Sequence, residues 1–229
     1  MLLAIITYIV LLIVYVKGVF YIKILLQGGQ KRELYLPDRK KGRWLILSIF
    51  DVLFLRRLFR VNKLLWIGEW LFHISFVFVV LSHLRFILNF LPSWWSHLVC
   101  IGKYAGVVMT ISMLYILTVR ASIDYKRYIS PGNLLLILLI FFIGLSGLLL
   151  RYTFRVDVIA VKAFMLGVFG FSPQPAPEHG IFIFHYLLVL LLLIYLPSHI
   201  LTAPITTSEA RKREYFVTYK QTMDDEKIY

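Results

Sequence analysis

The sequence predicts an all-α integral membrane protein built as a bundle of five transmembrane helices. Of its 229 residues, 60% are hydrophobic, and the mean hydropathy is +0.79. This composition is far more apolar than that of an ordinary soluble domain. Five apolar runs also reach or exceed the roughly 18 residues needed to cross a bilayer. A helix is the only single segment that satisfies its own backbone polar groups in lipid.

The five runs lie at about residues 2–26, 64–91, 98–119, 133–150 and 180–201. The first run opens at Met1 without a basic flank or a small-residue cleavage site, which favours a retained helix over a cleaved signal peptide. The third run contains Gly102 and Gly106 in a G-x-x-x-G spacing, and the fourth contains Gly144 and Gly147. Such small residues permit close contact between helices in a membrane.

The distribution of basic residues predicts the orientation. Eighteen of the 25 Lys and Arg residues fall in loop 27–63, loop 120–132 and the tail 202–229, which lie on one side. By the positive-inside rule, the N-terminus is outside and the C-terminus cytoplasmic. A net charge of +13 could suit nucleic acid in a soluble protein, but beside membrane helices it serves orientation and contact with lipid headgroups. We therefore expect a multi-pass protein of the cell membrane and no nucleic acid.

Two regions outside the spans have distinct character. Residues 43–60, RWLILSIFDVLFLRRLFR, are apolar but interrupted by Asp51 and paired arginines, which predicts an amphipathic helix on the cytoplasmic face. Loop 151–179 contains Pro173, Pro175 and Pro177 and is the only sizeable outer segment. The predicted domain covers residues 1–201, followed by a cytoplasmic tail at 202–229.

Four of the six histidines fall inside two predicted helices. His73 and His83 lie in the second, and His185 and His199 lie in the fifth. An ionisable side chain in hydrocarbon is costly and indicates function. A lone histidine could be a neutral imidazole that donates to a neighbouring carbonyl, but two pairs on two helices favour ligation.

Antiparallel helices would pair His73 with His199 near the cytoplasmic side and His83 with His185 near the outer side. Two imidazoles per iron make a six-coordinate haem suited to electron transfer, so the pattern predicts two b-type haems with these four axial ligands. The spacings differ, at about 15 Å on the second helix and about 21 Å on the fifth. Helix tilt and Pro197 could absorb part of that difference.

The single cysteine, Cys100, excludes a disulfide, a C-x-x-C-H haem attachment and an iron–sulfur ligand set within this chain. Any haem is therefore held non-covalently, and any iron–sulfur cluster belongs to a partner.

The stretch EWLFHISFVFVVLSHL on the second helix resembles the gamma subunit of respiratory nitrate reductase. It also resembles the related membrane cytochromes of the sulfite-reductase-linked complex, of heterodisulfide reductase and of some uptake hydrogenases. The stretch FIFHYLLVLLLLIYLPSHILTAP resembles the fifth helix of those proteins. In the nitrate reductase subunit the second histidine of that helix lies further along, at Ala203 here. His199 therefore replaces it, or the inner haem is ligated differently.

The resemblance implies a membrane-anchoring dihaem cytochrome b subunit of a respiratory complex. It would transfer electrons between the quinone/quinol pool and an iron–sulfur or catalytic partner subunit. The terminal chemistry would belong to that partner. A non-redox transporter or a structural anchor is the alternative, although the sequence has no inverted repeat or broken Gly/Pro-rich helix.

The resemblance also implies a quinone site near Lys103, which matches a quinol-site lysine of the nitrate reductase subunit, with Ser82 beside His83 assisting. Lys103 could instead snorkel to the interface. Arg151 and Arg155 follow the fourth helix and could bind haem propionates through bidentate hydrogen bonds, or anchor the interface.

Three further residues have weaker expectations. We expect His97 and His179 to lie at the membrane interface. His179 could instead relay the protons that quinol oxidation releases. Glu69 could orient His73 or lie at the headgroup level.

Overall fold

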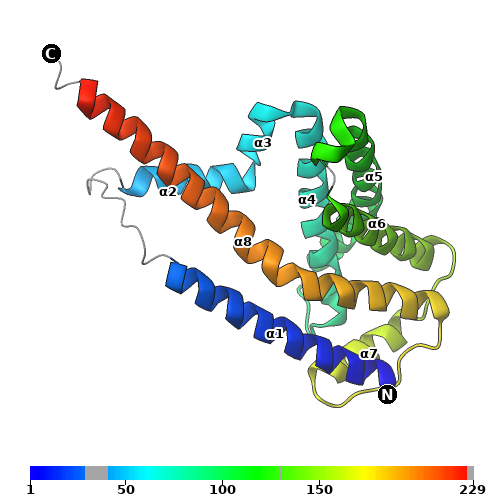
Figure 1. The fold of residues 1–229 in the computed structure, drawn as a ribbon. Helices are drawn as coiled ribbons and strands as arrows, with labels where there is room; N and C mark the ends of the chain where they lie inside the picture. Colours follow the sequence, from blue (N-terminus) through cyan, green and yellow to red (C-terminus); the bar gives the residue numbers. More distant parts are fainter. Residues whose placement is uncertain (29–40, 129, 226–229) are drawn as a thin grey trace. The chain divides into compact units, whose positions relative to one another are not determined.

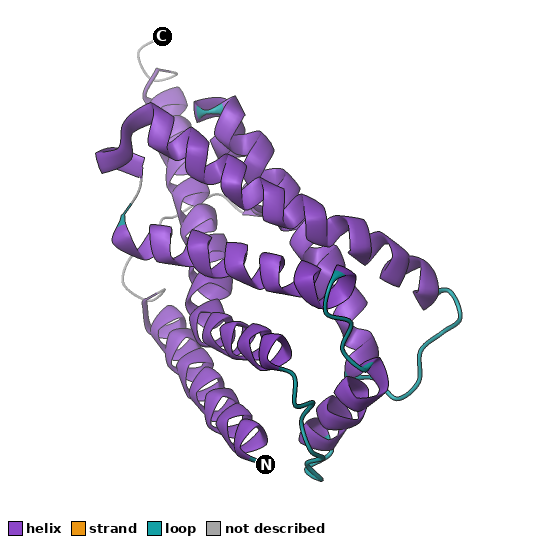
Figure 2. Cartoon of the chain, turned by 90° about the vertical axis from the view of Figure 1, so that its right-hand side faces the viewer, coloured by secondary structure: helices purple, strands orange, loops and turns teal. Residues whose placement is uncertain are grey.

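All described residues of the chain are helical or lie in loops (Figure 2). In the computed structural model, residues 1–28, 41–128 and 130–225 are described. In these ranges, five helices are long and apolar enough to cross a membrane: Leu2–Ile24, Lys63–Phe86, Trp95–Ile123, Pro131–Tyr152 and Gly180–Thr218. The predicted all-α, five-span class is therefore confirmed, and the chain is a multi-pass membrane protein.

The chain divides into two compact units, each described by itself. The first unit comprises Met1–Leu12 and Asn62–Ile194, and the second comprises Ile13–Val61 and Tyr195–Tyr229. Two helices, α1 (Leu2–Gly28) and α8 (Gly180–Asp225), are each divided between the units (Figure 1). The first part of each helix belongs to the first unit and the remainder to the second.

The first unit contains most of the bundle. Its complete elements are α4 (Lys63–His83), the 3-10 turn η3 (Leu84–Phe86), α5 (Trp95–Tyr128), α6 (Pro131–Tyr152) and α7 (Val158–Phe169). Side-chain oxygens cap the starts of three helices. The Asn62 oxygen accepts from the N–H of Leu65 (3.0 Å), the Ser130 hydroxyl from that of Asn133 (3.3 Å) and the Asp157 carboxylate from that of Ile159 (2.8 Å). The sequence therefore specifies these helix starts locally.

Glycines set the close approach of the helices. A Cβ at Gly102 of α5 would collide with Ser82 of α4, and one at Gly144 of α6 would collide with Thr110 of α5. A Cβ at Gly106 would make only ordinary contact with Leu148, at 3.8 Å. The two glycines of the G-x-x-x-G pattern thus face different neighbours, and only Gly102 is required by close packing.

An apolar centre joins α7 to the first halves of α1 and α8. The Phe164 side chain is fully buried and lies edge-on to the rings of Phe182 and Tyr186. The Tyr186 hydroxyl forms a hydrogen bond with the Thr7 hydroxyl (2.9 Å), and the Tyr8 hydroxyl donates to the carbonyl of Val168 (2.9 Å). The expectation that 151–179 is only a loop is therefore wrong, because its apolar part forms α7 and fills this centre.

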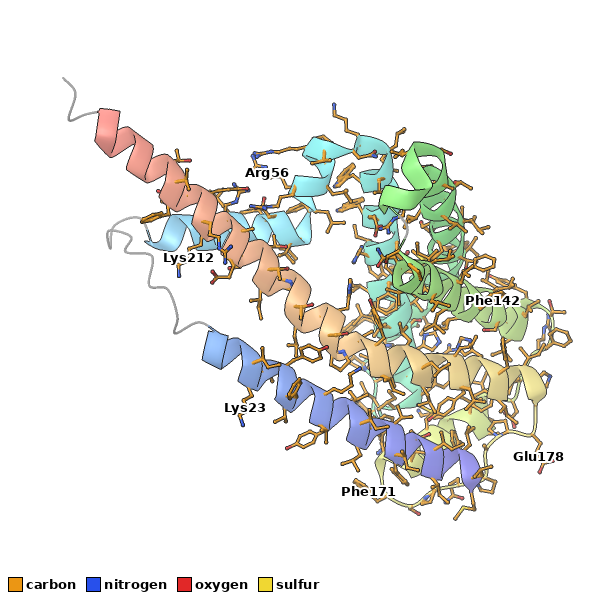
Figure 3. The ribbon with its side chains drawn as sticks, viewed as in Figure 1. Lys23, Arg56, Phe142, Phe171, Glu178 and Lys212 are labelled. Carbon is orange, nitrogen blue, oxygen red and sulfur yellow. The ribbon has the colours of Figure 1, made fainter. Side chains whose placement is uncertain are left out.

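Large apolar side chains also cover the outside of the first unit, as a lipid-facing surface requires. Phe142 on α6 and Phe171 after α7 are examples, at 44% and 84% exposed (Figure 3). Phe171 stacks on Tyr8 with a centroid separation of 5.9 Å.

The predicted interfacial helix at 43–60 is two helices, α2 (Lys41–Leu53) and α3 (Arg56–Val61). The break lies at Leu55, whose φ of 47° is left-handed and cannot continue an α-helix. On α2, Ile46, Ile49, Phe50 and Leu53 are exposed at helical spacing, which leaves one apolar face uncovered within the second unit. Lys31, Arg32, Arg39, Lys40 and Lys227, which entered the orientation argument, lie outside the described residues.

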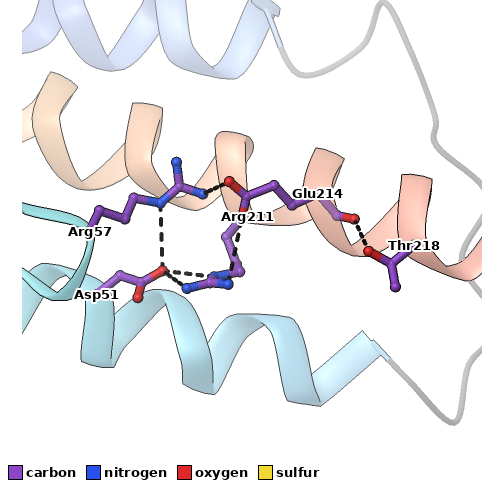
Figure 4. Close-up of polar contacts among 5 residues, drawn as sticks. All are labelled: Asp51, Arg57, Arg211, Glu214 and Thr218. Carbon is purple, nitrogen blue, oxygen red and sulfur yellow. Dashed lines mark hydrogen bonds and ion pairs between the residues drawn. The ribbon is translucent and has the colours of Figure 1, made fainter. Parts of the chain in front are cut away.

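The opposite face of α2 carries a buried charge network with the C-terminal part of α8 (Figure 4). The Asp51 side chain is fully buried and accepts from Nε of Arg211 at 2.7 Å. Arg57 lies 3.7 Å from the same carboxylate and 2.8 Å from Glu214. Asp51, which interrupts the apolar pattern in the sequence, therefore holds α2 and α3 to α8.

Two predicted helix ends are wrong. The second predicted helix, 64–91, ends at His83 and turns once more through η3, and the fifth, 180–201, continues unbroken to Asp225 with Pro197 and Pro204 inside it. Hydropathy predicts where the apolar part of a helix ends. The α-helix itself continues for as long as its backbone hydrogen bonds do. The segment expected as a tail from residue 202 is therefore helical through Asp225.

Candidate functional site

His83 is the last residue of α4, at the end of the bundle where η3 begins. Its Nδ1 donates to the carbonyl oxygen of Val79, one turn earlier, at 2.7 Å. The Ser82 hydroxyl lies 3.5 Å from the same nitrogen, and the ring centroid lies 5.9 Å from that of Phe86. Because a carbonyl can only accept, Nδ1 carries the proton and Nε2 carries the lone pair.

His185 lies in the second turn of α8 and is held by α6. Its Nδ1 is 2.9 Å from the hydroxyl oxygen of Ser146. That hydroxyl donates to the carbonyl oxygens of Phe142 (2.6 Å) and Ile143 (3.1 Å), so its oxygen accepts from the imidazole. A Cβ at Gly147 would lie 3.2 Å from Cε1 of His185, so the glycine makes room for the ring.

His73, ten residues earlier on α4, has the same kind of hydrogen bond as His83. Its Nδ1 donates to the carbonyl oxygen of Glu69 at 2.6 Å, and its ring lies edge-on to Phe72. The Glu69 carboxylate pairs with Arg120 of α5 at 2.6 Å. Glu69 therefore orients His73 through its backbone, while its side chain is engaged elsewhere.

These three histidines share one property. Each has Nδ1 engaged by an oxygen acceptor, and no group among the described residues bonds to Nε2. A hydrogen bond at one ring nitrogen fixes the tautomer and orients the other nitrogen as a ligand. In the described parts of the chain, no group of three or more His, Cys, Asp and Glu side chains could hold a bare metal ion.

Both members of the outer predicted pair, His83 and His185, lie in the first unit, and their pairing on one haem stays a prediction. The titratable groups within electrostatic range of His83 are His185, Arg85 and Arg151. Arg151 is half-buried and Arg155 is exposed. The inner pair is different, because His73 belongs to the first unit and His199 to the second, so their pairing stays a prediction.

Lys103 directly follows the contact between α4 and α5. Since Gly102 abuts Ser82, the backbone of Lys103 lies at the level of Ser82 and His83. Ser82 is buried and its hydroxyl donates to the carbonyl of Val79 at 2.8 Å. Ser82 thus adjoins His83 in the chain, and Lys103 follows the glycine that Ser82 contacts, while a quinone site at these residues stays a prediction.

Sequence reasoning missed Ser146 and Arg85. Ser146 is the single polar residue in the G-L-S-G stretch of α6, and a lone hydroxyl between two helix-contact glycines was the available signal. Of the interface histidines, His97 is exposed, whereas His179 is half-buried with its ring 6.0 Å from that of Phe154.

The fold and these histidines define a class: multi-pass helical membrane proteins whose helices carry imidazoles with Nδ1 engaged and Nε2 free of partners among the described residues. Two relatives narrow it. The chain is 29% identical over 185 residues to a protein of Archaeoglobus profundus named Hdr-like menaquinol oxidoreductase cytochrome b-like subunit, covering 67% of this chain and 55% of that protein. It is 30% identical over 149 residues to the protein of the same name from Archaeoglobus fulgidus, covering 58% and 45%.

The chain spans about half the length of these curated relatives. No family model matches the chain, and no solved structure matches it. The similarity supports the broader expectation of a related membrane cytochrome b family, and it does not show the nitrate reductase gamma subunit in particular.

Proposed function

We propose that this chain is the membrane-anchoring dihaem cytochrome b subunit of a respiratory oxidoreductase in the cell membrane. It would transfer electrons between the quinone/quinol pool and an iron–sulfur or catalytic partner subunit. The observation that carries the proposal is the shared state of His73, His83 and His185, each oriented through Nδ1 with Nε2 left for a ligand. The similarity to two cytochrome b-like subunits of menaquinol oxidoreductases supports it.

The residues present fit haem b. His83 and His185 would hold the outer haem, and His73 with His199 the inner one. Gly147 keeps the His185 ring uncrowded, and the buried Nε of Arg85 has no acceptor among the described side chains, as expected beside an anionic group. Haem with two imidazole ligands supplies one-electron transfer without binding oxygen.

Residues at the outer end of the bundle would bind the quinone. Lys103 would donate a hydrogen bond to a quinone oxygen, with Ser82 assisting, at the level of His83. Arg151 and Arg155 would bind haem propionates. In the orientation given by the basic loops, the partner subunit would dock at the cytoplasmic face, near the inner haem.

A reduced-minus-oxidised spectrum of the purified membrane protein tests the proposal. We expect the α-band of b-type haem and a haem content of two per chain by the pyridine haemochrome method. Absence of the band would instead favour a transporter or a structural anchor.

A further inference from the structure

At the outer end of the first unit lie two cations for which no carboxylate among the described residues is a partner. Arg85 on η3 and Arg151 at the end of α6 are close enough for their charges to act on each other. Two like charges held together in a partly desolvated place are costly unless an anion neutralises them.

Buried hydrogen-bond donors near the same helix ends lack acceptors. The Nε of Arg85 on η3 and the indole Nε1 of Trp95 at the start of α5 are buried, and no described residue accepts from them. Buried donors are nearly always satisfied, so each unsatisfied one requires an explanation. The Arg85 guanidinium also lies over the ring of Phe86, 4.5 Å from its centroid, which holds its plane in place.

The two arginines flank the outer histidines. Arg85 lies two residues after His83, and Phe86 bridges them because its ring is 5.9 Å from that of His83. The charge of Arg151 acts on His83, and Gly147, one turn before Arg151, touches His185. An anion between the arginines would therefore lie beside the position proposed for the outer haem.

We propose that Arg85, in place of the exposed Arg155, joins Arg151 in binding the two propionate carboxylates of the haem held by His83 and His185. The inference rests on the proposed function and adds Arg85, which sequence alone did not suggest. A guanidinium offers a planar fork of donors that matches a carboxylate. Two such contacts would limit the rotation of the bound haem.

The pair also sets the redox behaviour of that haem. Positive charge beside the haem favours the reduced state, which carries one more electron, so removal of either arginine lowers the midpoint potential. Removal also leaves a propionate without its cation, so protonation of that carboxylate becomes easier near neutral pH. The midpoint potential of the variants therefore depends more steeply on pH than that of the wild type.

Optical redox titrations at several pH values test this on Arg85→Gln and Arg151→Gln. Lys162→Gln is the matched control, since it removes one positive charge from α7 of the same unit. We expect both arginine variants to show a lowered potential and a steeper pH dependence for the haem that His83→Ala removes. Lys162→Gln should behave as the wild type.

Unchanged potentials and pH profiles in both arginine variants, with the haem present, would overturn the inference and leave the proposed function intact. Where a Gln variant loses the haem, Arg85→Lys and Arg151→Lys decide: retention supports charge neutralisation, and loss overturns it. Mass spectrometry would show whether the variants lose a tightly bound anionic phospholipid. Loss of that lipid together with unaltered haem titrations would overturn the inference and assign the two arginines to a lipid headgroup. A wild type without an α-band would contradict the proposed function itself.

Discussion

Ser146 on α6 receives the Nδ1 proton of His185 on α8 at 2.9 Å, while its own hydroxyl proton is committed to the carbonyls of Phe142 and Ile143. The hydroxyl has a single proton, which the two carbonyls share. The imidazole is therefore the donor in the contact between His185 and Ser146. The serine therefore selects the tautomer of His185 with Nε2 as ligand.

Replacement of Ser146 by alanine should weaken the outer haem. Without its acceptor, His185 loses orientation and tautomer preference, and loss of such a partner commonly costs about 10–100-fold in affinity. Haem retention during dilution in detergent measures the effect. Ser75→Ala is the control, because Ser75 makes the same bonds to preceding carbonyls without touching a histidine. Equal retention by both variants would show that Ser146 has no role in ligation.

His83→Ala and His185→Ala should each remove the same haem. Both changes delete one of two axial ligands, so either variant should retain about half of the pyridine haemochrome signal, and the double variant should lose no more. His97→Ala, at an exposed histidine outside the expected ligand set, should keep the full content. If the two single variants lose different haems, the pairing is wrong.

Lys103→Ala should impair turnover with a quinol analogue and leave the haem content intact. The physical reason is the loss of a hydrogen-bond donor at the level of Ser82 and His83. Steady-state reduction of the haems by the quinol analogue provides the measurement, with Lys162→Ala as the lysine control. Normal quinol kinetics in Lys103→Ala would reject the site.

Gly102→Ala should perturb the contact between α4 and α5, whereas Gly106→Ala should be tolerated. The added methyl group would overlap Ser82 in the first variant and would meet Leu148 at 3.8 Å in the second. Overpacking typically costs about 1–3 kcal/mol, while alanine in open helix gains up to about 1 kcal/mol over glycine. Thermal unfolding in detergent distinguishes them, and a stable Gly102→Ala variant would contradict the close packing.

Asp51→Ala should destabilise the second unit. The variant leaves Arg211 partly buried without its carboxylate, and removal of one partner of a buried pair costs about 3–5 kcal/mol. Limited proteolysis of the C-terminal part of α8 and thermal unfolding report the loss. Glu214→Gln, at a side chain 57% exposed, should change stability by no more than about 1 kcal/mol. Similar behaviour of both variants would show that Asp51 does not hold α8.

The sequence was sufficient to predict the five spans and the four histidines on two of them. Hydropathy measures transfer into lipid, which is a property of each segment alone, and the ionisable residues in such segments are visible directly. The ends of the helices were predicted less well, since α4 stops at His83 and α8 continues to Asp225 without a change that hydropathy could record. The helix α7 was missed for a similar reason, because its 12 residues are too few to span.

Only the tertiary structure decided what surrounds the histidines. Whether Ser146 reaches His185, or Arg85 lies near Arg151, depends on the rotation and separation of helices that are distant in sequence. Those are set by contacts such as Gly102 with Ser82 and Gly147 with His185, where one missing methyl group lets two helices approach. The sequence therefore determined which residues could act as ligands and, through contacts within α4, which nitrogen of His73 and His83 is left to bind. The contact between α6 and α8 determined that nitrogen for His185.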